Sequence, residues 1–342
     1  MKGRLLVAGA VALALSACGN GPLPMPAGSG AHGSPSGSAS GPTPRGTAAP
    51  SGPAGGGAAV PSPSPSPSPT GRYAFVPNYE EPEDRSLLAA QKLMKDNHLL
   101  EDWALTANEG FFPPVNVPII ADQCDGINAL YDPETRSIVI CYEMIDYLAE
   151  LFREPDKGKK SKPSAKEVDK SVVGAMNGIF YHELGHGLID LYDLPATGRE
   201  EDSVDQLAAL VLIQGAEDQD DYTDIISTIE TWGRVSQSED VDKQAFADEH
   251  SLSLQRYYNM MCYLYGSDHN GFLQLVADGE LPVSRAVRCE EEYRKMAHAW
   301  STLLTPHLRN DLPSVSPSPY PTPTPYASPS RVLRTTSAGH GG

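Results

Sequence analysis

Two stretches of low-complexity sequence constrain most strongly what this chain can fold into. Residues 19–70 consist almost wholly of Gly, Pro, Ala, Ser and Thr, and a similar Pro-, Ser- and Thr-rich composition returns from Pro313. Such segments carry too few large apolar side chains to bury a core, and proline-rich chains form extended, semi-rigid spacers. The composition therefore predicts a disordered spacer at 18–71, one folded domain at 72–312 and a disordered tail at 313–342.

The first residues have the pattern of a secretory signal. A short basic stretch precedes an apolar run over residues 5–15, which is too short to span a bilayer stably. Residues 15–18, Leu-Ser-Ala-Cys, resemble the lipobox of bacterial lipoproteins, in which cleavage precedes the cysteine and its thiol receives a lipid. We expect a signal peptide at 1–17, a lipid on Cys18 and attachment to the extracytoplasmic face of the cell membrane.

The cysteine count agrees with export. The chain has 5 cysteines, and if Cys18 carries lipid the others form an even set, which in an oxidising compartment predicts disulfides. Proximity along the chain favours Cys124 with Cys141 and Cys262 with Cys289, although the sequence alone leaves other pairings open. No C-x-x-C pair is present, which disfavours a zinc site made of cysteines.

The charge of the chain disfavours a nucleic-acid partner. Its formal net charge is −18, whereas a phosphate-binding face needs clustered Lys and Arg. The one basic cluster, residues 157–166, is typical of a solvated loop before a helix.

Strand signals lie in the first half of the folded domain. Apolar residues at helical spacing predict a helix over residues 87–100. The β-branched segment 115–120 predicts a strand, and so do residues 127–131 and 137–141. An Asp-Pro-Glu-Thr turn at residues 132–135 separates the last two strands and predicts a hairpin.

The remainder of the domain has helical patterning. The segments with this pattern are 142–152, 165–192, a helix from Gly198 that carries apolar residues to Leu212, 221–231, 252–265 and 284–304. A small N-terminal sheet with a hairpin, followed by a mainly helical half, makes the expected fold α+β.

The helix predicted at 165–192 carries a metal-binding motif, because residues 182–186 read His-Glu-Leu-Gly-His. Histidines at i and i+4 project from one helix face and can bind a single cation. Glu183 lies between them and can accept a proton from a zinc-bound water, as a metallopeptidase requires. Five-residue motifs also arise by chance, but an apolar helix in an exported chain favours one Zn²⁺ held by His182 and His186, with Glu183 as general base.

The third ligand must come from another segment, because no third histidine follows at metzincin spacing. Glu201 and Asp205 are four residues apart and share the apolar face of the next helix. Glu200 ends a capping-box pattern that would commit its side chain to the helix backbone, and the macrodipole alone also favours acids here. We expect Glu201 as third ligand and Asp205 as the carboxylate that orients His182, with Glu200, Asp202 and Asp205 as the alternative ligands.

A peptidase also needs a group that stabilises the oxyanion of the tetrahedral intermediate. The candidates are His250, Tyr257 and Tyr258. Tyrosines at helical spacing more often belong to the core, and His250 fits a structural hydrogen bond equally well.

At these residues the chain resembles the gluzincins. Their signature is H-E-x-x-H followed by a helix with E-x-x-x-D, which matches His182, Glu183, His186, Glu201 and Asp205. The interval between the two halves of the signature is shorter here than in the large members of that clan.

Three further segments, residues 129–133, 181–212 and 255–259, resemble a bacterial family catalogued as metallopeptidase-like proteins of unknown function. This likeness extends over most of residues 74–310. It implies a zincin-type fold with the metal site in the helical half, and a peptide or protein substrate.

Two functions agree with these patterns. The first is a zinc-dependent endopeptidase tethered to the cell envelope. The alternative is a catalytically inactive, zinc-stabilised binding or scaffold lipoprotein. A third hypothesis is that the protein binds no metal, and measurement of the metal content of the purified protein tests it.

Overall fold

The computed structural model describes residues 73–155, 161–219 and 221–309. The expected signal peptide, lipid anchor, spacer and tail lie outside the described residues, at 1–17, Cys18, 18–71 and 313–342. Within the described ranges, no helix combines the length and the apolar character that a membrane crossing requires.

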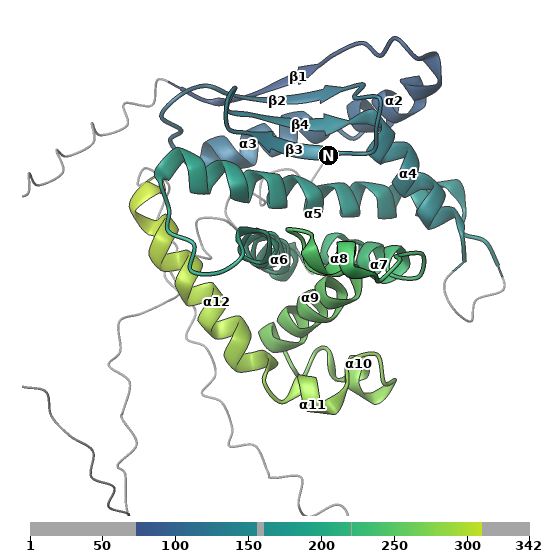
Figure 1. Cartoon of the computed structure of the whole chain (residues 1–342), viewed down its shortest axis with the longest axis vertical. Helices are drawn as coiled ribbons and strands as arrows, with labels where there is room; N and C mark the ends of the chain where they lie inside the picture. Colours follow the sequence, from purple (N-terminus) through teal and green to yellow (C-terminus); the bar gives the residue numbers. More distant parts are fainter. Residues whose placement is uncertain (1–72, 156–160, 220, 310–342) are drawn as a thin grey trace, which may run out of the picture. The chain divides into compact units, whose positions relative to one another are not determined.

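A mixed four-stranded sheet forms the N-terminal part of the domain (Figure 1). Its strands are β1 (Phe75–Tyr79), β2 (Val117–Asp122), β3 (Ala129–Asp132) and β4 (Ser137–Cys141), in the order β1-β2-β4-β3. The first, second and fourth strands run parallel, and β3 runs antiparallel to β4 with Leu130 opposite Val139. The sequence did not indicate β1, because this edge strand buries only Phe75 and contains Pro77, a weak strand former.

The hairpin of β3 and β4 is present where the turn signal predicted it. Asp132 accepts hydrogen bonds from the backbone N–H of Glu134 at 2.8 Å and from the Thr135 hydroxyl at 2.7 Å, which closes the turn. A disulfide joins Cys124 to Cys141, whose Cα atoms are 5.4 Å apart. The pairing expected from proximity is therefore the one in the structure, and it ties the loop before β3 to the end of β4.

One predicted helix is wrong in its extent. Residues 87–100 contain the helix α2 (Leu88–Asp96) and the start of a second helix, α3 (Leu99–Gly110). The break lies at His98, which has a left-handed backbone with φ of 54°. Asn97 precedes it, and its side-chain amide caps the carbonyl of Leu93 at 2.8 Å, which ends α2.

The rest of the domain is helical. The long helices are α4 (Tyr142–Arg153), α5 (Ala165–Tyr192), α6 (Glu200–Gln219), α7 (Thr223–Val235), α9 (Ser253–Ser267) and α12 (Cys289–Leu304). Short helices are α8 (Lys243–Ala247), α10 (Leu273–Ala277), α11 (Val283–Ala286) and the 3-10 turns Arg85–Leu87 and Thr305–His307. The helix predicted at 284–304 is thus divided into α11 and α12. The second expected disulfide, Cys262–Cys289, joins α9 to α12.

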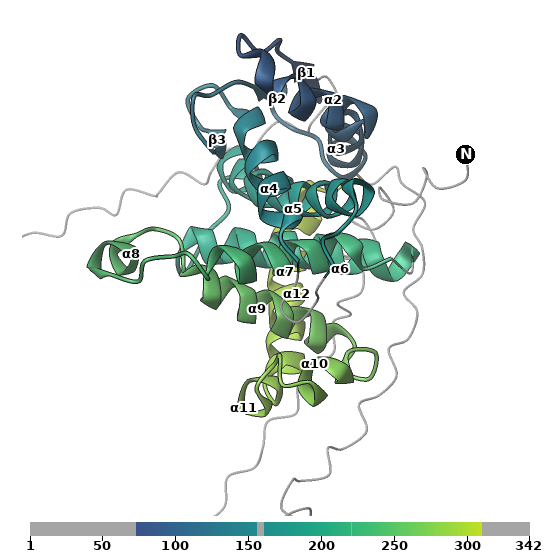
Figure 2. The ribbon, with the colours of Figure 1, turned by 90° about the vertical axis from the view of Figure 1, so that its right-hand side faces the viewer.

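Helix α5 occupies the middle of the domain, between the sheet and the helices α6, α7 and α9 (Figures 1 and 2). It packs against α4, β3 and β4 on one side and against α6 and α7 on the other. A capping box fixes its start, since Ser164 and Glu167 each bond to the other's backbone N–H. Gly185 lets α6 approach closely, because a Cβ at this position would lie 2.8 Å from Val204 on α6.

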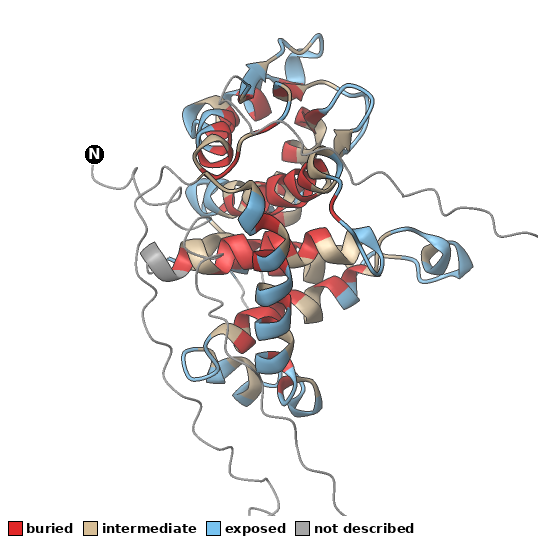
Figure 3. Cartoon of the chain, turned by 90° about the vertical axis from the view of Figure 1, so that its left-hand side faces the viewer, coloured by how far each residue is buried: buried red, intermediate tan, exposed pale blue. Residues whose placement is uncertain are grey.

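Buried residues gather where these layers face one another, and the outer faces of the helices are exposed (Figure 3). Trp103 of α3 stacks on Phe180 of α5 with ring centroids 4.6 Å apart. The small sheet followed by a helical half confirms the predicted α+β class, and α5 and α6 carry the metal motif and its expected third ligand.

Candidate metal centre

Two helices bring three candidate ligands together. His182 and His186 lie one turn apart on α5, and Glu201 lies in the first turn of α6. The Nε2 atom of His182 is 3.1 Å from Oε2 of Glu201, and the Nε2 atom of His186 is 3.3 Å from Oε1 of the same carboxylate. One ligand atom from each of the three lies within 4.8 Å of the other two.

Further carboxylates occupy the opposite nitrogen of each ring. The Nδ1 atom of His182 is 2.9 Å from Asp205, and that of His186 is 2.7 Å from Glu200. A neutral imidazole has a single N–H, so each ring can satisfy only one of the two carboxylates that it faces. When both rings are neutral and donate outward through Nδ1, the Nε2 lone pairs point at the Glu201 carboxylate, and either a proton on Nε2 or a bound cation relieves their repulsion.

The cluster fits a divalent metal ion such as zinc. Oε2 of Glu201 is buried and has no hydrogen bond of acceptable geometry, although the Nε2 atoms of His182 and His250 lie 3.1 and 3.0 Å away. An unsatisfied buried carboxylate oxygen is costly unless a cation compensates it. Ligands of tetrahedral zinc, bound at about 2.0–2.1 Å, are separated by about 3.3 Å, close to the Nε2–Oε separations seen here.

The pKa values of the cluster residues also indicate that these carboxylates favour a neighbouring positive charge. Burial alone would lower the pKa of His182, but hydrogen bonds to Asp205 and Glu201 raise it to about 9. Burial would raise the pKa of Glu201, yet the three imidazoles that surround it hold the pKa far below its usual range. Burial also opposes ionisation of Asp205, whereas the charge of Arg256 and the bond to His182 lower its pKa to about 2. Glu201 and Asp205 are therefore ionised at neutral pH, and their negative charge favours a bound cation.

Glu183 has the environment of a proton acceptor. Its side chain is buried, and Oε2 accepts a hydrogen bond of 2.9 Å from the backbone N–H of Tyr131 in β3. Burial raises the pKa of this carboxyl, while the neighbouring histidines His182 and His186 oppose the rise. A carboxylate with a raised pKa can take up a proton more readily near neutral pH.

His250 lies at the same cluster, in the segment between α8 and α9. Its Nε2 atom is 3.0 Å from Glu201, its ring lies parallel to that of His182 with centroids 6.1 Å apart, and its side chain is about 42 % exposed. Arg199, just before α6, donates to its carbonyl at 3.3 Å. The structure thus brings this candidate to the open side of the cluster.

The structure does not bring Tyr257 and Tyr258 to the cluster. Both line a groove of about 650 Å³ between α4, α7, α9 and α10, to which the residues of the cluster do not contribute. The Tyr257 hydroxyl donates to Glu280 at 3.0 Å. Successive helical residues are rotated by about 100°, so α9 directs Arg256 to Asp205 and the two tyrosines to the groove.

The sequence did not predict the contacts of Glu200, which was considered as an alternative third ligand, or any role for Arg256 at the cluster. Glu200, expected to bond to the helix backbone, instead accepts from Nδ1 of His186. Arg256 is buried and bonds to Asp205 through two nitrogens, at 2.7 and 2.5 Å. The signal that could have indicated Arg256 is an arginine on a helix that is otherwise packed into the core, since such a side chain needs a buried carboxylate partner, but this signal would not have identified Asp205 as the partner.

A second group of metal-ligand types among the described residues, Cys124, Cys141 and Glu143, has a different explanation. The two sulfur atoms are joined in a disulfide and offer no thiolate. Glu143 accepts hydrogen bonds from the backbone N–H groups of Cys124 and Asp125. This group therefore closes a loop.

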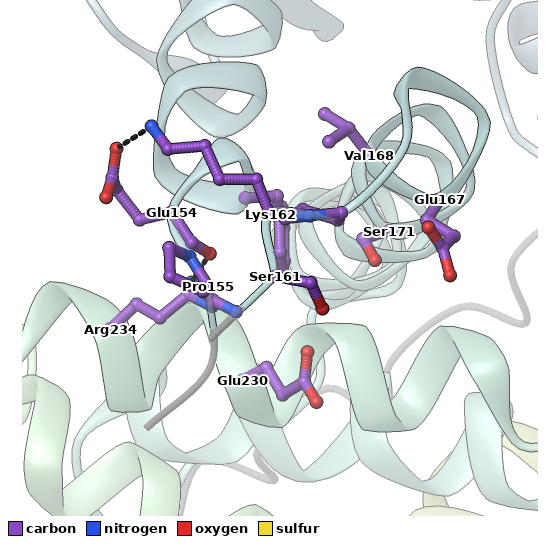
Figure 4. A pocket seen from close by; sticks show the side chains of 11 residues that line it. Glu154, Pro155, Ser161, Lys162, Glu167, Val168, Ser171, Glu230 and Arg234 are labelled. Atoms are coloured by element: carbon purple, nitrogen blue, oxygen red, sulfur yellow. Dashed lines mark hydrogen bonds and ion pairs between the residues drawn. The ribbon is translucent and has the colours of Figure 1, made fainter. Parts of the chain in front are cut away.

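A polar pocket of about 270 Å³ lies elsewhere, between the end of α4, the start of α5 and α7 (Figure 4). Lys162 and Glu154 form an ion pair of 3.3 Å at its rim, and Arg234 and Glu230 come from α7. None of the residues at the metal cluster lines it, so the cluster and this pocket are separate sites.

One protein-family model, described as "putative metallopeptidase", matches residues 79–304. The matched region begins in β1 and ends with α12, and it contains every residue of the cluster. No curated protein and no solved structure matches the chain.

Proposed function

The chain belongs to the putative metallopeptidase family, and from this premise we propose that it is a zinc-dependent endopeptidase with its active site at the α5–α6 cluster. One observation carries the proposal. Two imidazoles present their Nε2 atoms to Glu201 while carboxylates hold their Nδ1 atoms, which is the arrangement of a metal site with oriented ligands.

In this proposal His182, His186 and Glu201 would hold the metal, and two histidines with one glutamate are a ligand set of catalytic zinc sites. Bound zinc would supply a Lewis acid that polarises the peptide carbonyl and lowers the pKa of water to about 7. Glu183 takes the proton from the attacking water and passes it to the leaving amine. His250 donates from its imidazole to the developing oxyanion.

The position of the edge strand β3 is evidence in favour of a peptide substrate. Among the described strands it lies at the edge of the sheet, and the hydrogen bond from the Tyr131 N–H to Glu183 brings its outer backbone edge beside the proposed general base. Extended peptides bind to such edges through backbone hydrogen bonds. A substrate chain that continues β3 would place its peptide bonds next to Glu183.

We place the enzyme on the outer face of the cell membrane, held by a lipid on Cys18 after removal of residues 1–17. Residues 18–71 would then separate the catalytic domain from the membrane, and 313–342 would form a free tail. The lipobox-like sequence supports this placement, and the disulfides Cys124–Cys141 and Cys262–Cys289 suit an oxidising compartment.

The test compares wild-type protein with Glu183→Gln on a peptide library, with zinc content measured on both. We expect chelator-sensitive cleavage by the wild type, and a loss of about 100-fold or more in the variant with zinc retained. Glu167→Gln, on the same helix but in its capping box, is the matched control and should cleave normally.

Two outcomes would contradict catalysis. If Glu183→Gln cleaves as fast as wild type, the activity does not arise at this site. If the wild type holds zinc but cleaves no peptide, the alternative of a zinc-stabilised binding or scaffold lipoprotein takes its place.

A further inference from the structure

Arg256 of α9 lies behind the metal cluster. Its Nε atom donates to Oδ2 of Asp205 at 2.7 Å and a terminal nitrogen donates to Oδ1 at 2.5 Å. Both side chains are buried, with about 8 % and 10 % of their surface exposed. The guanidinium also stacks on the ring of Trp232 of α7, 3.5 Å from its centroid. Arg256 is thus held by a carboxylate from α6 and an aromatic ring from α7.

This arrangement determines which nitrogen of His182 carries the proton when the ring is neutral. The same terminal nitrogen of Arg256 is 3.4 Å from Nδ1 of His182, whereas Oδ1 of Asp205 is 2.9 Å from it. Nδ1 cannot donate to Asp205 and accept from Arg256 at once. The shorter, charge-assisted contact to the carboxylate favours a proton on Nδ1, which leaves the Nε2 lone pair facing Glu201.

Two parallel bonds from a guanidinium also fix the plane of the carboxylate. With the Arg256 fork in place, Asp205 keeps Oδ1 directed at His182. Without it, His182 would be the one remaining partner of Asp205 among these contacts, and the carboxylate could turn away from the imidazole.

We propose that Arg256 is a positioning residue of the metal site, which acts through Asp205 to orient His182 and so raises the affinity of the site for zinc. The inference rests on the proposed function, since it presupposes a metal at His182, His186 and Glu201. Arg256 itself touches neither the metal nor the substrate.

The experiment measures zinc affinity by competition with a chromophoric chelator in wild type, Arg256→Met, Asp205→Asn and the double variant. Outer partners of metal ligands typically contribute about 10- to 100-fold in affinity, so we expect a loss of about 10-fold or more in each single variant. If Arg256 acts through Asp205, Arg256→Met should cost less than about 2-fold in the Asp205→Asn background. A full, additive loss in the double variant would overturn the proposal.

A matched control is Arg285→Met, which removes a less buried arginine that also pairs with a carboxylate, Glu292 at 2.7 Å, away from the cluster. Its zinc affinity should equal that of wild type. If Arg256→Met does not fold, the zinc affinity of Arg256→Lys is measured instead, because an ammonium keeps the charge but cannot make the two parallel hydrogen bonds. An affinity several-fold below wild type supports the proposal, and an unchanged affinity overturns it.

A spectroscopic signature is independent of the metal. In metal-free wild type, the Nδ1–H proton of His182 should give a slowly exchanging, downfield NMR resonance that disappears or shifts in Arg256→Met and persists in Arg285→Met. Zinc binding that is intact in wild type and unchanged in Arg256→Met contradicts only this inference. A wild type that binds no zinc contradicts the proposed function as well.

Discussion

At the scale of single residues, carboxylate partners at Nδ1 orient the two imidazoles so that their Nε2 atoms face Glu201. Asp205 and Glu200 hold the Nδ1 atoms, and the Nε2 atoms face Glu201. Asp205 is about 10 % exposed and Glu200 about 45 %, so water competes more strongly for the second contact. The orientation of His182 is therefore the more firmly determined of the two.

The glycine inside the motif sets the distance between α5 and α6. Because a Cβ on Gly185 would approach Val204 within 2.8 Å, Gly185→Ala should destabilise the protein by about 1–3 kcal/mol through overpacking, partly offset by the better helix propensity of alanine. The variant should also bind zinc more weakly, since Glu201 moves with α6. Urea unfolding and zinc titration measure both effects.

The control for this change is Gly198→Ala, just before α6. Among the described residues, apart from its two chain neighbours, no atom lies within 4 Å of a Cβ at that position, so we expect unchanged or slightly increased stability. Equal stability of the two variants would mean that the helices separate without cost, contrary to the packing described.

The buried carboxylate of Asp224, away from the cluster, should make the free energy of unfolding depend on pH. Burial raises the pKa of Asp224, against the effect of its hydrogen bond from Asn177. The stability that the protonated form contributes is present below the pKa of the unfolded chain and is lost as the pH rises through the folded pKa. Asn does not titrate, so Asp224→Asn should become more stable relative to wild type as the pH rises from about 4 to 7.

Each unit of pKa difference corresponds to about 1.4 kcal/mol, which urea unfolding at several pH values resolves. A stability difference that stays constant over this range would contradict a raised pKa for Asp224.

At the scale of elements, the Cys124–Cys141 disulfide restrains the hairpin that carries Tyr131 to Glu183. The cysteines are 17 residues apart, and a loop of that size corresponds to about 3 kcal/mol of stabilisation in the chain-entropy model. The double variant Cys124→Ala/Cys141→Ala should lose about 2–4 kcal/mol in unfolding free energy. An unchanged stability would show that the rest of the sheet already restrains the loop.

Elements with strong local signals could be predicted from the sequence. The bounds of α5 and β4 agree with the prediction, because a capping box opens α5 at Ser164 and the turn at residues 132–135 precedes β4. Local patterns did not reveal β1, whose strand character comes from pairing with β2. The prediction also missed the break at His98, because it joined the apolar residues on either side of the polar stretch 95–98 into one helix.

The same limit applies to the site. The motif on α5 and the acids of α6 could be placed together, because i, i+4 spacing fixes which side chains share a helix face. The pairs His186–Glu200 and Asp205–Arg256 join residues 14 and 51 positions apart, and only the packing of α5, α6 and α9 brings them into contact. Helix rotation likewise separates Tyr257 from the cluster.

At the scale of the whole molecule, the cluster joins the two halves of the described domain. Its candidate ligands come from α5 and α6, the proposed general base Glu183 accepts a hydrogen bond from the edge strand β3, and Arg256, which bonds to Asp205, comes from α9. A metal bound here would link these elements and stabilise the folded state by mass action.

Zinc-edge anomalous diffraction from crystals of the purified protein shows whether His182, His186 and Glu201 bind zinc. We predict one zinc ion per chain, bonded to Nε2 of His182, Nε2 of His186 and a carboxylate oxygen of Glu201 at about 2.0–2.2 Å. An anomalous map without a peak between these three side chains, from protein purified in the presence of zinc, would contradict the account.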